Sequence, residues 1–134
     1  MIRFLAQVLV LSLLSLPGIA LAGYDLHITR ASGWTLSSKH PISEFEWKTA
    51  VTSDDQLRME MSATAENPKT HEAIQVSNPL MASWVDPTSK EKYYFYYFEG
   101  EIVVKNPSEN VIAKMKSLAK KLSARVQGDD GEWY

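Results

Sequence analysis

Three carboxylates lie close together near the C-terminus, at Asp129, Asp130 and Glu132, and Trp133 follows them. Such a group can bind a cation or a basic surface of a partner protein. The flanking glycines of the sequence Gly-Asp-Asp-Gly are equally typical of a solvated turn. The ligand series of a calcium loop is absent. The segment is therefore predicted to be either a partner-binding site or a plain turn, and no metal is expected.

An unbroken aromatic run over residues 93–98 is the second candidate. On a strand its side chains alternate, so Tyr94, Tyr96 and Phe98 share the face opposite to Tyr93, Phe95 and Tyr97. One face must cover the core. The other can stay exposed, as at protein interfaces and glycan-binding surfaces, or be covered as well. Tyr94 and Tyr96 are accordingly predicted to bind a partner.

No recognisable catalytic set is present. His27, His40 and His71 lack the spacing of a zinc motif. There is no cysteine nucleophile, no serine in a nucleophile elbow and no phosphate-binding glycine loop. Paired acids such as Glu99 and Glu101 occur commonly on exposed faces. We predict no catalytic residues, no metal and no cofactor.

Residues 1–22 resemble a secretory signal peptide. Arg3 precedes an apolar run over residues 4–16, Pro17 and Gly18 break the helix, and Ala-Leu-Ala at 20–22 is a small-x-small cleavage site. Cleavage there leaves one domain, residues 23–134, in the periplasm or outside the cell. The alternative is an uncleaved anchor, although the run is shorter than the roughly 20 residues that span a bilayer. This is the only membrane attachment that the sequence suggests.

Composition argues against several classes of protein, namely nucleic-acid-binding proteins, lipoproteins and disulfide-stabilised domains. The formal net charge of −2 argues against binding to bulk nucleic acid. With no cysteine, there is neither a lipid attachment site nor a disulfide, so the domain must be stabilised by core packing. The oligomeric state is not indicated.

Hydrophobic patterning predicts an α+β fold, with a single antiparallel-rich sheet and two main helices covering one of its faces. Ser43 with Glu46 forms a capping box, and Phe45, Trp47, Ala50 and Val51 are the expected buried positions of that helix. Ser108 is the expected N-cap of the second helix. Strands are predicted at residues 24–30, 57–61, 72–77, 81–85, 93–98, 101–105 and 125–127.

Two segments resemble the opening and the close of a group of small bacterial proteins. The first is YDLHITR at residues 24–30, with Trp34 and then PISEFEW at 41–47. The second is GEIVVKNP at 100–107, continuing through Lys114 to ARVQGDDGE at 124–132. This group resembles immunity proteins of contact-dependent and polymorphic toxin systems.

The resemblance implies a stoichiometric binder of a bacterial toxin rather than an enzyme. Asp129, Asp130 and Glu132 would then contact basic toxin residues, and Trp133 and the aromatic run would act as anchors. A small periplasmic enzyme or glycan-binding protein is the alternative. A self-associating envelope protein with the aromatic strand at a sheet edge is a third possibility.

Overall fold

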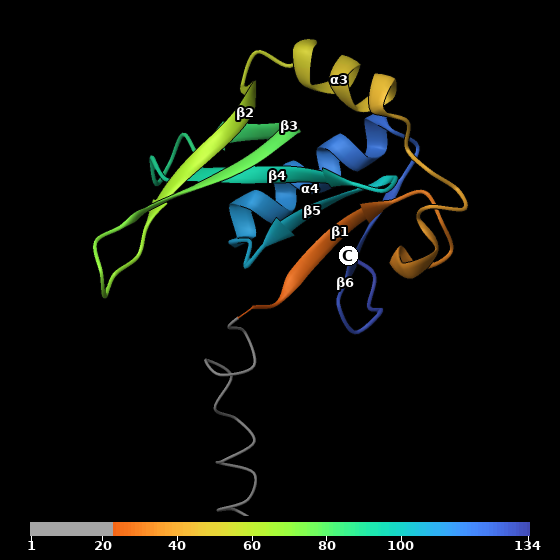
Figure 1. Cartoon of the computed structure of the whole chain (residues 1–134). Coiled ribbons are helices and arrows are strands. Elements are labelled where there is room, and N and C mark those ends of the chain that lie inside the picture. The colour runs from red at the N-terminus through yellow and green to blue at the C-terminus, as the bar shows by residue number, and fades with distance from the viewer. Residues whose placement is uncertain (1–22) are drawn as a thin grey trace, which may run out of the picture.

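The computed structural model describes residues 23–134, apart from the side chains of Met61, Ala63, Ala65 and Val76 (Figure 1). The predicted signal peptide lies outside this range. Neither helix in the described part of the chain is long and apolar enough to cross a membrane.

One six-stranded antiparallel sheet organises the domain, in the order β2-β3-β4-β5-β1-β6. Two helices, α3 and α4, and a short 3-10 turn, η1, complete it, and the predicted α+β class is confirmed. The bounds are β1 Asp25–Thr29, η1 Trp34–Leu36, α3 Glu44–Thr52, β2 Leu57–Glu66, β3 Ala73–Val85, β4 Lys92–Phe98, β5 Glu101–Lys105, α4 Glu109–Lys121 and β6 Arg125–Gly128.

Both helices begin at the predicted caps. The Ser43 side chain accepts a hydrogen bond from the Glu46 amide, and the Glu46 carboxylate accepts one from the Ser43 amide. Glu46 also accepts two hydrogen bonds from Arg30, whose guanidinium reaches the Leu122 carbonyl beyond α4. These contacts hold the pKa of Glu46 at about 2, with the Arg30 hydrogen bonds as the largest cause. Ser108 accepts from the Val111 amide and so caps α4.

The core lies between one face of the sheet and both helices. Leu26, Ile28, Phe95 and Ile102 face it, and Trp47 of α3 is fully buried there. The remaining helix contacts come chiefly from Ala50, Val51, Val111, Met115 and Leu118.

The predicted burial of Phe45 is wrong, since this side chain is 77% exposed. It lies in the first turn of α3, whose buried stripe runs through Trp47, Ala50 and Val51 instead. An apolar side chain alone does not say on which side of that stripe it falls.

Two strands expected at 72–77 and 81–85 are one long strand, β3. The ladder to β2 shifts register between Glu60 and Ser62, where Asn78, Pro79 and Leu80 form a bulge. Proline is tolerated at a bulge because no ladder hydrogen bond is required of it there. The Asn78 side chain accepts from the Leu80 amide and donates to the Tyr97 carbonyl, and Trp47 donates to the Leu80 carbonyl. The bulge is therefore a fixed part of the fold.

A tight turn at Glu99 and Gly100 joins β4 to β5. Both residues have positive φ, 45° and 91°, the backbone of the hairpin turn that matches strand twist. A Cβ on Gly100 would lie 2.6 Å from the Ser37 carbonyl oxygen and 2.7 Å from the Pro41 Cβ. The loop between β1 and α3 therefore packs directly on this turn.

Candidate functional site

The most unusual polar group in the described chain is a buried histidine, His27, in the middle of β1. Its neighbours Leu26 and Ile28 face the core, so strand alternation directs His27 to the opposite face of the sheet. The residue is nevertheless only 4% exposed. Because the helices pack on the other face of the sheet, another part of the chain must cover His27.

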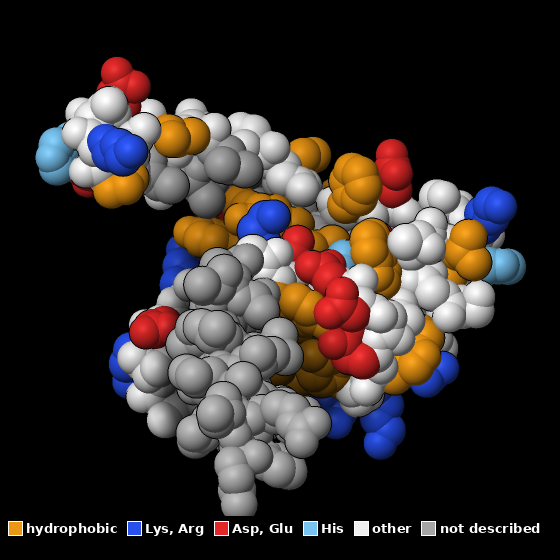
Figure 2. Space-filling model, turned by 90° about the horizontal axis from the view of Figure 1, so that it is seen from below, with side chains coloured by type: hydrophobic (Ala, Val, Ile, Leu, Met, Phe, Trp, Pro, Cys, Tyr) orange, Lys and Arg blue, Asp and Glu red, His pale blue; other side chains and the backbone are white. Residues whose placement is uncertain are grey.

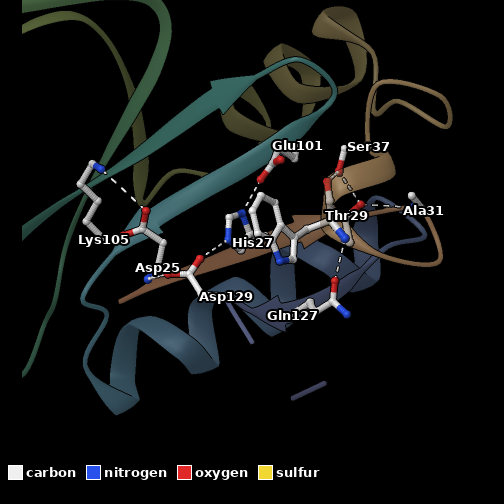
Figure 3. A network of polar contacts seen from close by, with 10 residues as sticks. Asp25, His27, Thr29, Ala31, Ser37, Glu101, Lys105, Gln127 and Asp129 are labelled. Carbon is white, nitrogen blue, oxygen red and sulfur yellow. Dashed lines mark hydrogen bonds and ion pairs between the residues drawn. The ribbon is translucent and has the colours of Figure 1, made fainter. Parts of the chain in front are cut away.

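Two carboxylates hold the His27 ring at its two nitrogens (Figure 3). Nδ1 lies 2.5 Å from Oε1 of Glu101, at the start of β5, and Nε2 lies 2.7 Å from Oδ1 of Asp129, just after β6. A carboxylate accepts hydrogen bonds, so both ring nitrogens act as donors, which is the imidazolium state. We call these three residues the His27 cluster.

The environment favours the charged ring despite its burial. Burial lowers the pKa of His27, but the hydrogen bonds to Glu101 and Asp129, together with their negative charges, raise it by more. The net effect is a pKa above the ordinary value for histidine.

The loop between β1 and α3 covers the cluster. The Trp34 ring stacks on the His27 ring with centroids 4.1 Å apart and planes 5° apart. The Trp34 amide donates to the side chain of Gln127 on β6 at 2.7 Å. Thr29 and Ser37 hydroxyls bond to each other at 2.7 Å and attach the same loop to β1.

This arrangement suits a structural clamp better than catalysis. Both imidazole nitrogens are occupied and Trp34 covers one face of the ring, so no atom of His27 is placed to exchange a proton with a substrate. Within residues 23–134 no group of three His, Asp or Glu side chains is arranged to bind a metal ion.

The acidic turn, Asp129, Asp130 and Glu132, was predicted from the sequence to bind a partner. Two of its three carboxylates make hydrogen bonds within the chain. Asp129 accepts from the Asp25 amide as well as from His27. Glu132 accepts a hydrogen bond from the Tyr24 hydroxyl. Burial and then this bond raise the pKa of Tyr24. Asp130 is exposed, and its carboxylate makes no hydrogen bond or ion pair with the described side chains.

Trp133 is half-buried beside the same turn. Its ring lies under the Arg125 guanidinium, 3.8 Å from the centroid, and its backbone forms a bridge with Gln127. The Tyr134 amide then donates to the Val126 carbonyl. The C-terminal residues thus cover the outer margin of β6.

The structure places the aromatic run as expected from its alternation. Phe95 is fully buried in the core, while Tyr94 and Tyr96 are half-buried on the other face and Phe98 is 57% exposed. The Tyr94 and Tyr96 rings are 6.4 Å apart, and Lys92 lies over Tyr94. We call Tyr94, Tyr96 and Phe98 the aromatic row.

The aromatic row and the acidic turn belong to the same face of the sheet. Tyr96 pairs with Val103 on β5, which in turn pairs with His27, whose ring reaches Asp129. Figure 2, which looks onto the end of the molecule carrying the β6 turn, shows acidic side chains in a row beside hydrophobic ones. The aromatic row on β4 and the acidic turn after β6 therefore share one face of the sheet, with β5 and β1 between them.

Sequence reasoning treated the members of the His27 cluster separately. His27 was considered with His40 and His71, Glu101 with Glu99, and Asp129 with Asp130. Glu101 and Asp129 lie 74 and 102 residues from His27 in sequence, and only the β5-β1-β6 pairing joins them. The available signal was a histidine between two apolar residues of a predicted strand.

Comparison with known proteins adds no relative: no protein-family model, curated protein or solved structure matches this chain.

Proposed function

We propose that this chain is a periplasmic or secreted binding protein of the immunity type, which holds one bacterial toxin domain in a stoichiometric complex. The observation that carries the proposal is the aromatic row on the sheet face that the helices leave uncovered. Aromatic side chains at the centre of an interface contribute much of its binding energy.

The acidic turn supplies the charge beside this row. Asp130 is free to pair with a basic residue of a partner, whereas Asp129 and Glu132 position the turn through His27 and Tyr24. Charge of one sign beside an aromatic anchor speeds association and selects the partner. A basic surface on the toxin domain fits this arrangement.

The alternative of a small enzyme receives less support from the geometry. Its best candidate group, the His27 cluster, is closed by Trp34 and has no ring nitrogen left for a substrate. A glycan-binding role would use the same aromatic row, so the experiment must separate protein from glycan.

The test is capture of partners from a periplasmic extract of the native bacterium, using tagged protein expressed from the sequence of residues 1–134. We expect one protein in equimolar amount. Tyr96→Ser and Asp130→Lys should each reduce its recovery at least about tenfold, as loss of an interface anchor does. Phe45→Ser is the matched control, because Phe45 is an exposed aromatic residue on α3, away from the aromatic row.

A second readout separates an immunity protein from other binders. Expressing the captured protein in the compartment where it acts should harm cells, and co-expression of this chain should protect them unless Tyr96 or Asp130 is changed. Capture that Tyr96→Ser leaves intact, or enrichment of glycan without protein, contradicts the proposal.

A further inference from the structure

The β2–β3 hairpin extends beyond the rest of the sheet. β4 pairs with β3 only from Ala82 to Val85, whereas the β2–β3 ladder continues to the pair Glu66 and Ala73. Residues 62–66 and 73–77 therefore form a two-stranded arm, which projects from the body in Figures 1 and 2. A two-stranded hairpin without further strands or packing is marginally stable in water.

The outer margin of β2 is open along its length. Among residues 23–134, the backbone of residues 58–66 bonds to no element other than β3. The opposite margin differs, since the C-terminal residues cover β6. An uncovered strand margin is a template for pairing with another strand.

The charges of β2 distinguish between registers for such pairing. Its charged residues are Arg58, Glu60 and Glu66, and residues 61–65 carry no charge. Antiparallel pairing of two β2 strands about a two-fold axis centred on Ser62 places Arg58 opposite Glu66 twice. Centring on residue 63 instead places Glu60 opposite Glu66, and centring on Glu60 places it opposite itself. Opposite charges stabilise a cross-strand pair, and like charges destabilise it.

We propose that the β2 margin pairs with β2 of a second copy, antiparallel and centred on Ser62, to form a symmetric dimer with one continuous sheet. In this register residues 62–66 of one arm lie against residues 58–62 of the other copy. Each arm gains a third strand from the body of its partner. Both Arg58 and Glu66 are exposed, so the pairing requires no rearrangement of the core.

The test is sedimentation equilibrium of the purified protein between about 1 and 200 µM, where a weak homodimer assembles by mass action. We expect a monomer–dimer equilibrium. Arg58→Glu and Glu66→Arg should each raise the dissociation constant about tenfold, because two favourable pairs become two repulsive ones. The double exchange, Arg58→Glu with Glu66→Arg, should restore it to within about threefold of the original value.

Lys69→Glu is the control, because this residue lies in the arm tip outside the proposed pairing. It alters the charge of the arm but should leave the dissociation constant unchanged. The proposal is overturned if the protein is a monomer at all concentrations. This holds also if its arm pairs with a strand of another protein but not with a second copy. So does a dimer that the two single charge reversals leave unaffected or that the double exchange fails to restore. Circular dichroism verifies that every variant is folded.

Discussion

At the scale of single residues, the His27 cluster makes the stability of the domain depend on the protonation state of His27. Its imidazolium is held by Glu101 and Asp129 and covered by Trp34, although it faces away from the main core. A buried charge of this kind is stable only while its partners remain. The stability of the domain should therefore respond both to pH and to removal of the ring.

The response to pH has a definite sign. Because the folded-state pKa of His27 is raised, its contribution to stability is fully present below the unfolded pKa, about 6.5, and is lost as pH rises through the folded pKa. A tenfold change in a proton affinity corresponds to about 1.4 kcal/mol of stability. Urea unfolding between pH 6 and 9 should show this fall. Glu101→Gln should lower the His27 pKa measured by NMR, whereas a pKa unchanged by this substitution contradicts the proposed pairing.

Removal of the ring should cost more than removal of an exposed histidine. His27→Gln leaves Glu101 and Asp129 without their cation, and loss of one partner of a buried ion pair costs about 3–5 kcal/mol. The free energy of unfolding, measured by urea titration at pH 6, should fall by that order. His40→Gln, at an exposed histidine in the same loop that carries Trp34, should change it little. Equal effects at the two histidines would show that the cluster contributes nothing specific.

At the scale of elements, the turn between β4 and β5 joins the sheet to the loop that covers His27. The Ile42 amide donates to the Gly100 carbonyl at 2.9 Å, and the Tyr97 hydroxyl donates to the Ile42 carbonyl at 2.7 Å. The turn therefore fixes both the aromatic strand and the start of α3. The stability of this turn depends on its backbone conformation more than on its side chains.

Gly100→Ala should destabilise the protein by at least about 2 kcal/mol, because positive φ and a close contact with Ser37 and Pro41 act together. Thermal unfolding measures the change. Gly33→Ala is the matched control, since Gly33 has an extended backbone and its nearest neighbour to an added Cβ is 4.0 Å away. A similar loss in both variants would show that the positive φ and the close contacts of Gly100 contribute nothing specific.

Local patterns predicted most of the elements, and long-range packing explains the differences. The capping box at Ser43 and the alternation of residues 93–98 depend on neighbours in sequence, and both were predicted. The bulge at Asn78 depends on Trp47 and Tyr97, which lie far away along the chain. The aromatic row and the acidic turn were visible as residue types, but the use of Asp129 by His27 required the sheet order.

At the scale of the whole molecule, the two ends of the domain are joined. Tyr24 bonds to Glu132 across 108 residues, and the Asp25 amide bonds to Asp129 across 104. The C-terminal residues also cover the margin of β6. The C-terminal residues therefore hold the start of β1 in place through these hydrogen bonds.

A chain ending at Gly128 should therefore lose several kcal/mol of stability, since it lacks the Asp129 partner of His27, the Glu132 partner of Tyr24 and the Trp133 bridge. Urea unfolding of the truncated protein tests this. Asp130→Asn in the complete chain is the control and should be nearly neutral, because Asp130 is exposed. If the truncated protein is as stable as the chain of residues 1–134, the contacts of the C-terminal residues do not stabilise the domain.

The position of β1 also has a consequence in time. This first strand lies inside the sheet, between β5 and β6, so its neighbours are complete only once synthesis has passed Lys105 and Gly128. Contacts between such distant segments form slowly. Folding of this domain must therefore wait until β6, the last strand of the sheet in chain order, has been synthesised.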